Sequence, residues 1–241
     1  MNDLRHAPLT AQEREALNGG AWFASLSPTL RHDILRHASV SRHADGDLIA
    51  MAGQPAGAWL ACARGAVQVG STSANGRSVT HDYVEPGHWL GALDLLDELP
   101  LAHDLRAHGP TTLLRVSRGA FLSIRDAHFV ELSQALLRLE AARTRRLFEQ
   151  VEDLKTLNLR ERLAKQLLEL AGRHGRSDES GVRITLRLAQ WELAQMLGAS
   201  RQRINEQLKH LEREAAIRRD AGGLVLCDLD ALRCAGEGLA A

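Results

Sequence analysis

Residues 189–214 read AQWELAQMLGASRQRINEQLKHLERE, which is two short amphipathic segments joined by a single glycine. Apolar residues recur every three or four positions in each segment, a spacing typical of helices with one buried face. Gly198 can adopt the positive φ of a sharp turn, and the Ser200 hydroxyl can cap a following helix. We therefore predict a helix over about 190–196, a tight turn and a second helix, which together form a helix-turn-helix.

The polar face of the second segment carries side chains suited to DNA. Arginine donates in a fork to guanine, glutamine and asparagine can pair with adenine, and lysine suits a phosphate. A helical hairpin with a merely solvated polar face is the alternative, since short amphipathic pairs are common. The predicted DNA-contacting residues of this segment are Ser200, Arg201, Gln202, Arg203, Asn205, Glu206 and Lys209.

A β-hairpin is predicted immediately after the second helix. The runs 216–219 and 224–226 can form two short strands, and the glycines at 222–223 can form the turn between them. A hairpin in this place is the wing of a winged helix-turn-helix, a much narrower class than the two helices alone. Arg218 and Arg219 on this wing are further predicted DNA contacts.

The composition describes a globular chain of about two domains. Its 241 residues are 44% hydrophobic and 25% charged, which is typical of soluble proteins. No apolar run is long enough to cross a bilayer and the start lacks a signal-peptide core, so we expect a cytoplasmic protein without a membrane partner. The 30 basic and 30 acidic residues cancel, so DNA binding must depend on where the arginines lie.

The residues give little support for metal or catalytic chemistry. The three cysteines, Cys62, Cys227 and Cys234, fit no common zinc spacing, and we expect reduced thiols, with Cys62 and Cys227 buried in apolar strands. His32-Asp33 and His103-Asp104 match dipeptides of metal phosphohydrolases, but two such pairs are expected by chance among 11 histidines. With no phosphate loop or nucleophile motif, we predict neither an enzyme nor a metal site.

The N-terminal half has the pattern of a compact all-β unit. Short segments rich in Val, Leu, Ile and Ala alternate with glycine turns over residues 39–116, and Asn75-Gly76 is the strongest hairpin signal. A short helix near residues 11–17 and helical sequence from Phe23 to His37 are predicted before it, and Leu26-Ser27-Pro28 supplies a cap and a first-turn proline within the second segment.

A helical period extends over about residues 117–157. Such a helix packs either on a second copy of itself or on its own β unit, and we favour a homodimer. Asn158 and Glu161 have the spacing of a capping box, which predicts a new helix and a hinge. A charged loop over 172–181 and a short strand over 182–186 should follow. The apolar stripe of the long helix consists of Leu132, Leu136, Leu139, Leu147, Val151 and Leu154.

An all-β unit, a long helix and a winged helix-turn-helix, in this order, resemble the Crp/Fnr superfamily of bacterial transcription regulators. The resemblance covers nearly the whole chain and is strongest in LGASRQRINEQLKHLERE at 197–214, DGDLIAMAG at 45–53 and PGHWLGALDLL at 86–96. It implies an α+β fold with a β-roll sensor of the cyclic-nucleotide-binding, jelly-roll type with leading helices at 1–125, a long dimerisation helix at 126–157 and a winged helix-turn-helix at 158–241.

The resemblance also implies partners and roles. Ser200, Arg201 and Lys209 match the family's DNA-contacting pattern, whereas Gln202 and Glu206 stand where the best-known members have Glu and Arg. We therefore expect a different operator. The implied partners are double-stranded DNA, a second copy of the chain and an unidentified small-molecule effector, and a contact with RNA polymerase is left open.

The sensing site departs from the family pattern. Nucleotide-binding members have a Gly-Glu pair for the ribose and an Arg-Ser or Arg-Thr pair for the phosphate, whereas this chain has Gly91-Ala92 and Ala102-His103. A buried phosphate without a cation is costly, and Arg106 aligns with an ordinary strand position, so we predict no tight binding of cyclic AMP. The predicted effector pocket comprises Gly91, Ala92, Leu93, Ala102, His103, Arg106, Arg143 and Leu147.

Other chemistries of the family remain as alternatives. An iron–sulfur cluster needs four cysteines, so three exclude it. We expect no cofactor. Haem is the minor alternative, and a cyclic dinucleotide, a small organic effector or no effector stay open. An interaction module that does not bind DNA is a further alternative. Glu206 and the uncapped Ala189 favour this alternative, whereas the arginines of the second helix and the wing oppose it. The candidate haem ligands are His81, His88, His103 and His108.

Overall fold

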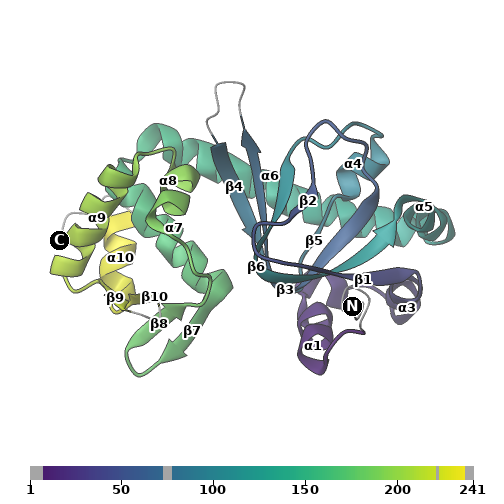
Figure 1. Cartoon of the computed structure of the whole chain (residues 1–241), viewed down its shortest axis with the longest axis horizontal. Coiled ribbons are helices and arrows are strands. Elements are labelled where there is room, and N and C mark those ends of the chain that lie inside the picture. Colours follow the sequence, from purple (N-terminus) through teal and green to yellow (C-terminus); the bar gives the residue numbers. More distant parts are fainter. Residues whose placement is uncertain (1–7, 73–77, 221–222, 237–241) are drawn as a thin grey trace. The chain divides into compact units, whose positions relative to one another are not determined.

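The computed structural model describes residues 8–72, 78–220 and 223–236, and contacts divide the chain into two compact units, Met1–Thr144 and Arg145–Ala241 (Figure 1). Each unit buries its own apolar cluster. The long helix α6 (Phe129–Thr156) contains the point of division, so its first half belongs to the N-terminal unit and its second half to the C-terminal unit.

The N-terminal unit is built on an antiparallel β-sheet, as predicted. Among the described residues the strands have the order β1-β6-β3-β4, with β2 paired to β6 and β5 paired to β3. Thr72 and Ser78 lie opposite each other at the ends of β3 and β4, and the predicted Asn75-Gly76 turn lies outside the described residues. The elements before α6 are α1 (Ala11–Gly19), α2 (Ala21–Ala24), α3 (Pro28–Arg36), β1 (Ala38–His43), β2 (Leu48–Ala50), β3 (Ala58–Thr72), β4 (Ser78–Val84), β5 (Trp89–Leu90), α4 (Ala92–Leu96), β6 (Asp104–Ser117) and α5 (Arg118–Ala127).

The two faces of this sheet bury different clusters. Trp59 of β3 packs with residues of the helices, and its ring centroid lies 4.3 Å from that of Trp89. Leu60 and Cys62 of the same strand join Leu113 of β6 in a second cluster on the other face. Successive side chains of a strand point to opposite faces, which explains the alternation. The predicted all-β unit is thus confirmed.

The helical segment predicted from Phe23 to His37 is divided into two helices, and the predicted cap and first-turn proline are confirmed. The structure ends α2 at Ala24 and starts α3 at Pro28, with Ser27 as the N-cap. Proline suits a first helical position, where its missing N–H needs no partner. The backbone N–H of Ser27 donates to the Glu131 carboxylate of α6 at 2.7 Å, so a tertiary contact also holds the break.

A buried carboxylate joins α1 to the sheet. Glu13 is 2% exposed and accepts hydrogen bonds from Arg42 Nη1 of β1 and from the backbone N–H of Thr10, both at 2.8 Å. Burial by itself raises the pKa of Glu13, but hydrogen bonds from Arg42, Thr10 and Thr112 lower it to about 2. The ionised carboxylate is therefore the form that the fold stabilises.

Glu13→Gln is expected to lower the free energy of unfolding by about 1.5–3 kcal/mol at neutral pH, because the charge-assisted hydrogen bonds disappear. A group whose pKa is lowered by folding contributes stability above its unfolded pKa and loses it as the pH falls through the folded value. The difference between wild type and variant should therefore shrink from pH 4.5 down to about pH 2. Urea unfolding at a series of pH values measures it, and a difference independent of pH would contradict the assignment.

The C-terminal unit combines helices with a small antiparallel sheet of order β7-β8-β10-β9. Leu163 and Leu167 of α7 and Leu226 of β10 lie in its buried cluster. None of the helices in the described ranges is long and apolar enough to cross a membrane. The elements after α6 are α7 (Leu159–His174), β7 (Gly175–Asp178), β8 (Gly181–Ile184), α8 (Gln190–Leu197), α9 (Arg201–Arg213), β9 (Ile217–Asp220), β10 (Gly223–Leu226) and α10 (Leu229–Gly236).

The junction between α6 and α7 is capped as predicted. The Asn158 side chain accepts from the backbone N–H groups of Arg160 and Glu161, and the Glu161 carboxylate accepts from the Asn158 N–H at 2.8 Å. A new helix therefore starts here. The predicted domain boundaries at 125/126 and 157/158 fall close to the two ends of α6, whereas the compact units divide inside it.

The predicted loop over residues 172–181 is wrong. Helix α7 continues to His174, and the next four residues form β7, which pairs with β8. All four residues of β7 are exposed, so this edge strand has the polar composition of a loop. The predicted strand at 182–186 is confirmed as β8.

Candidate nucleic-acid interface

Helices α8 and α9 form the predicted helix-turn-helix. Gly198 ends α8 with φ 61°, in the left-handed region that favours glycine. The Ser200 side chain accepts from the backbone N–H of Arg203 at 3.3 Å and caps α9. The inward-facing residues are all buried, as predicted: Leu193, Ala194, Leu197, Ile204, Leu208 and Leu211.

The missing cap at Ala189 is compensated from within α8. The backbone N–H of Ala189 donates to the Glu192 carboxylate at 2.7 Å, and Glu192 is only 6% exposed. A carboxylate in the first turn also interacts favourably with the helix dipole. Helix α8 still has no side-chain cap at Ala189, but Glu192 satisfies the Ala189 N–H and stabilises the first turn.

The outer face of α9 presents polar side chains to solvent. Arg201, Arg203 and Lys209 are exposed, and their side chains form no ion pair or hydrogen bond with another residue that the structure describes. Gln202 and Glu206 are also exposed, and the Gln202 amide donates to the Glu206 carboxylate at 3.2 Å. The cations are thus available to an external acceptor, and Glu206 retains an unoccupied oxygen.

Asn205 is placed differently from its predicted companions. It is half-buried, and its Oδ1 accepts from Gln190 Nε2 of α8 at 3.0 Å and from Arg219 Nη1 of β9 at 3.3 Å. Bidentate pairing with adenine needs both the oxygen and the amide of asparagine. With the oxygen held by two donors inside the protein, Asn205 has only its amide left for DNA.

Arg219 links the wing to the recognition helix. Its guanidinium forms an ion pair with Glu212 of α9, and this contact lowers the pKa of the Glu212 carboxylate. Arg218 is exposed instead, and its nearest carboxylate contact is Asp220 at 3.6 Å. Of the two predicted wing arginines, Arg218 is the more accessible, and Arg219 has a structural role that its sequence position did not reveal.

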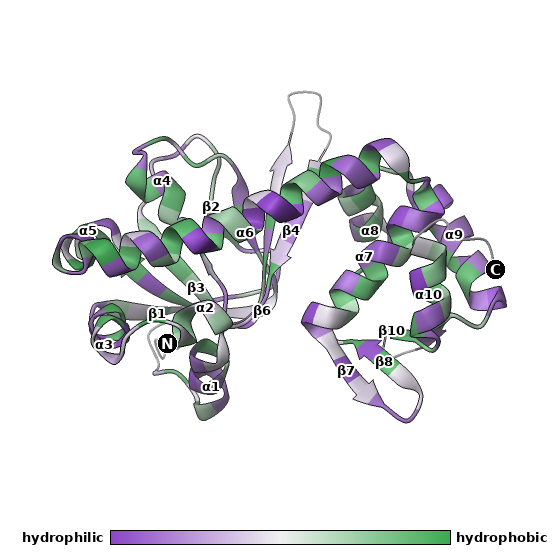
Figure 2. Ribbon diagram, turned by 180° about the vertical axis from the view of Figure 1, so that it is seen from behind, coloured by the Kyte–Doolittle hydropathy of each residue, from purple (hydrophilic) through white to green (hydrophobic). Residues whose placement is uncertain are grey.

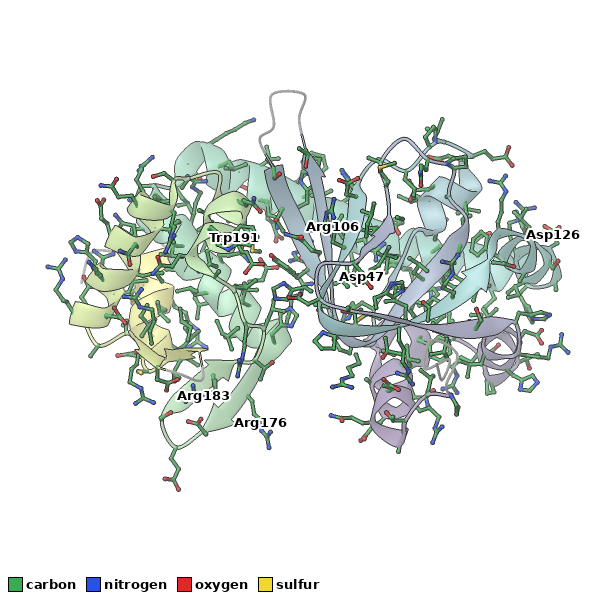
Figure 3. All side chains as sticks on the ribbon, viewed as in Figure 1. Asp47, Arg106, Asp126, Arg176, Arg183 and Trp191 are labelled. Atoms are coloured by element: carbon green, nitrogen blue, oxygen red, sulfur yellow. The ribbon has the colours of Figure 1, made fainter. Side chains whose placement is uncertain are left out.

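Three residues near this face were missed by the sequence analysis. Gln190 orients Asn205, and Glu212 holds Arg219. Trp191 on α8 is 49% exposed (Figure 3). Glu212 lies seven residues before Arg219 in the sequence. Only the folding of the wing against α9 brings their side chains together. An exposed tryptophan cannot be distinguished from a core one by its spacing.

The wing is a β-hairpin, as predicted. Strands β9 and β10 pair antiparallel from Asp220 opposite Gly223 to Ile217 opposite Leu226, and residues 221–222 lie outside the described residues. β10 also pairs with β8, where Arg183 donates to the Asp220 carboxylate at 2.7 and 2.9 Å (Figure 3). This pairing continues the wing into a larger sheet.

Polar and apolar residues alternate along α6 (Figure 2), and its apolar stripe divides into a buried and an exposed part. Leu132 and Leu136 are buried against the N-terminal unit, whereas Leu147, Val151 and Leu154 are 44–61% exposed. A row of outward-facing residues follows heptad spacing on the same helix. The members of this row, here called the α6 seam, are Val130, Leu137, Ala141, Phe148 and Val151.

Of the predicted effector residues, Gly91 alone lines the cavity that the structure describes in the N-terminal unit. Gly91 adopts φ 85° at the start of α4 and lines a cavity, whose other lining residues are not in the predicted set. Ala92 is buried and Arg106 is exposed on β6 (Figure 3). The Arg143 guanidinium is occupied by the Glu140 carboxylate and the Trp89 carbonyl. The remaining four, which are exposed, are Leu93, Ala102, His103 and Leu147.

Histidines stand where the family pattern has its phosphate-binding cation. The rings of His81 and His103 lie 4.6 Å apart between centroids. Partial burial lowers the pKa of His81, and His103 lowers it further, so positive charge is disfavoured here. Burial and the nearby Asp97 raise the pKa of Asp94. The His81 ring therefore does not provide a fixed positive charge for a phosphate.

Of the candidate haem ligands, His81 and His103 lie beside each other, whereas His88 and His108 have other neighbours. His81 contacts Ser71 Oγ at 3.1 Å, His88 lies 3.6 Å from the Glu85 carboxylate, and His108 packs on the Tyr83 ring. Within the described part of the chain, no three His, Cys, Asp or Glu side chains are close enough to hold a metal ion.

The cysteines are free thiols among the described residues. Cys62 is buried as expected, and burial raises the pKa of its thiol to about 12. Cys227 is exposed, so its predicted burial is wrong. It follows the last residue of β10 and therefore lies outside the apolar strand to which the sequence pattern had assigned it.

Two family models match this chain. Residues 161–235 match the Crp-like helix-turn-helix domain, and residues 40–128 match the cyclic nucleotide-binding domain. The first covers α8, α9 and the wing, and the second covers most of the β-sheet.

Curated relatives and solved structures agree with these matches. A CRP-like cAMP-activated global transcriptional regulator of Mycobacterium tuberculosis is 30% identical over 188 residues, which cover 78% of this chain and 83% of the relative. The cAMP-activated regulator CRP of Pasteurella multocida is 26% identical over 193 residues, 78% of this chain and 89% of the relative. The CooA structure from Carboxydothermus hydrogenoformans superposes with a TM-score of 0.69 at 20% identity, over 95% of this chain and 97% of that one, and shows the same fold.

Proposed function

The chain belongs to the CRP family of transcription regulators, and on this premise we propose that it binds a specific DNA sequence as a homodimer. The exposed polar face of α9 carries the proposal, because Arg201, Gln202 and Glu206 project from a helix anchored on α8. Retardation of duplexes from a random pool at low ionic strength tests it. An unretarded pool would mean that the fold is present but its DNA-binding function is not.

Each outward side chain has a distinct role in this proposal. Arg201 reads a guanine through its forked guanidinium. Glu206 is an acceptor and therefore suits the exocyclic amine of cytosine, whereas it would repel a phosphate. Asn205 donates through its amide alone. Ser200, Lys209 and Arg218 hold phosphates and set the register of the helix in the major groove.

The α6 seam supports the homodimer. Several large apolar side chains on one face of a helix are exposed in the single chain, which is unfavourable in water. Heptad spacing is the pattern by which two helices pack side by side. Pairing of two seams would bury these residues and place two recognition helices on neighbouring turns of a duplex, about 34 Å apart.

Lys209→Ala is expected to weaken binding to all DNA sequences alike and to reduce the slope of log affinity against log salt by about 1 for each half-site, because each protomer neutralises one phosphate fewer. Lys209 suits this role because it is exposed and unpaired among the described residues. Fluorescence anisotropy at several salt concentrations measures the slope. A changed base preference with an unchanged slope would show that Lys209 reads bases instead.

The N-terminal unit is proposed to sense an effector other than cyclic AMP. The named relatives of Mycobacterium tuberculosis and Pasteurella multocida are cAMP-activated. Here Arg143 is already paired, Ala102 has no charge, and His81 favours its neutral form. A cyclic phosphate in this place would lack its counter-charge.

Calorimetric titration with cyclic AMP is expected to give no binding at micromolar concentrations. The Pasteurella multocida regulator serves as the positive control, and Ala102→Arg, which introduces a cation, is expected to increase whatever affinity there is. Micromolar binding by the unmodified chain would overturn this part of the proposal.

A further inference from the structure

A cavity of about 180 Å³ lies in the N-terminal unit, between β2, the segment that follows it, β3 and β6. Most of the residues that line it have apolar side chains, among them Ile49, Leu60, Leu101 and Leu105, while polar atoms make up the larger part of its exposed surface. It touches the predicted effector residues only at Gly91. The cavity therefore adjoins the position of the family's sensing pattern: Gly91 lies in its wall, and Leu101 in the same wall directly precedes Ala102.

Arg115 is the cation of this cavity. It lies on β6 opposite Leu60 of β3, and it shares a strand face with Leu113, which belongs to the buried cluster of that side. Arg115 is half-buried, and its guanidinium forms no ion pair or hydrogen bond with another described residue. A guanidinium in a partly apolar wall interacts most strongly with a planar anion, which it can grip with two parallel hydrogen bonds.

The size of the cavity limits the ligand. An apolar cavity of about 150 Å³ accommodates benzene, whereas pockets for drug-sized molecules measure about 300–1,000 Å³. At about 180 Å³ this cavity can hold one ring with a small substituent, and it is too small for a nucleotide. With one arginine on the wall, a singly charged carboxylate matches the available charge better than a phosphate dianion.

The wall opposite β6 is already ordered. The backbone N–H of Gly53 donates to the Leu101 carbonyl at 2.8 Å, and the N–H of Leu101 donates to the Gln54 carbonyl at 2.9 Å. Pro55 and Pro100 form a further bridge between the same segments. A wall held in this way needs little ordering when a ligand enters, which favours binding.

From these observations we propose that the N-terminal unit binds a small aromatic monocarboxylate, with its ring against the apolar side chains of the cavity and its carboxylate on Arg115. This inference rests on the proposed function, in which the unit senses an effector, and it names the chemical class of that effector. The ring would contact Ile49, Leu60 and Leu105, and the Gln54 amide could bind a polar substituent.

Calorimetric titration of the full-length protein with benzoate and with uncharged benzamide tests the proposal. Benzoate is expected to bind at least about tenfold more tightly than benzamide, because only benzoate pairs with the guanidinium. Arg115→Gln should remove this preference and leave benzamide binding unchanged. Arg64→Gln is the matched control, since Arg64 is exposed on β3 and does not line the cavity.

Two further variants keep the test decisive. Ala58→Leu, which fills the cavity, should abolish binding of both compounds while Arg115 stays in place. Arg115→Lys keeps the positive charge but loses the two parallel N–H donors of the guanidinium, so it should weaken benzoate binding partially. This variant replaces Arg115→Gln in the test if the Gln variant does not fold. No benzoate binding at millimolar concentration, or binding that is insensitive to Arg115 and Ala58, would overturn the proposal.

A separate DNA measurement distinguishes this inference from the proposed function. Gel retardation of random duplexes, measured without benzoate, reports DNA binding independently of the cavity. Selective DNA binding without benzoate binding would refute only the cavity proposal. If benzoate binding requires Arg115 but the protein retards no duplex under any condition, only the proposed DNA-binding function is refuted.

Discussion

Phe148→Glu is expected to make the protein monomeric and to weaken its binding to a symmetric operator by about 10²–10⁴-fold, because the second recognition helix is no longer tethered to the first. Phe148 is 68% exposed on α6, and Val151 and Leu137 lie along the same face. A carboxylate at the centre of a paired seam would be desolvated without a partner, which costs several kcal/mol.

Ala142→Glu is the matched control for this variant. Ala142 is exposed on the same helix and lies six residues from Phe148, about 120° around the helix axis. The same carboxylate at this position should leave the dimer intact. Sedimentation analysis and gel retardation measure both variants. A dimer that survives Phe148→Glu, or one that dissociates equally with Ala142→Glu, would place the interface elsewhere.

Arg201→Ala is expected to cost about 1–3 kcal/mol of binding free energy for each half-site and to relax the preference at one base pair. Arg201 is exposed at the first residue of α9 and is unpaired among the described residues. The missing energy belongs to a bidentate interaction with a base edge, so binding to non-specific DNA should fall much less.

Arg213→Ala is the control that distinguishes loss of a base contact from loss of one positive charge on α9. Arg213 is exposed at the other end of α9, where it contacts His210 and the Lys209 carbonyl. Its removal takes away the same charge, and it should change affinity only slightly without altering base preference. Equal effects of the two variants in a gel-retardation series with single-base operator variants would contradict the reading role of Arg201.

The helix-turn-helix was predictable because its signals are local. Gly198 supplies the turn, Ser200 supplies the cap, and Ile204 with its helical neighbours supplies the buried face, all within one short stretch. Each of these effects acts between residues no more than a few positions apart. The capping box at Asn158 was predictable for the same reason.

What the sequence did not reveal depends on contacts between distant residues. The break between α2 and α3 is held by Glu131 of α6, and Arg219 is held by Glu212 across the helix and the wing. Strand β7 has the composition of a loop, and only its pairing with β8 orders it. Periodicity also could not show which residues of the α6 stripe are buried. Leu132 and Leu147 are equally apolar, but only Leu132 is buried in the core of the N-terminal unit.

The cavity beside Arg115 illustrates the same limit at the sensing site. Motif comparison pointed to Gly91 and the Ala102-His103 pair, because family patterns are read from short segments. The cavity is instead assembled from β2, β3, β6 and the segments between them. Its arginine lies in a strand that reads as ordinary core sequence, so only the three-dimensional arrangement identifies it.

Selection of bound sites from random duplex DNA tests the central claim most directly, because one measurement reports DNA binding, symmetry and half-site spacing. We predict enrichment of an inverted repeat whose half-sites are centred about 10–10.5 base pairs apart, or a multiple of this, with a conserved guanine in each half. No enrichment over the starting pool, or enrichment of a single unpaired half-site, would contradict a homodimeric sequence-specific regulator.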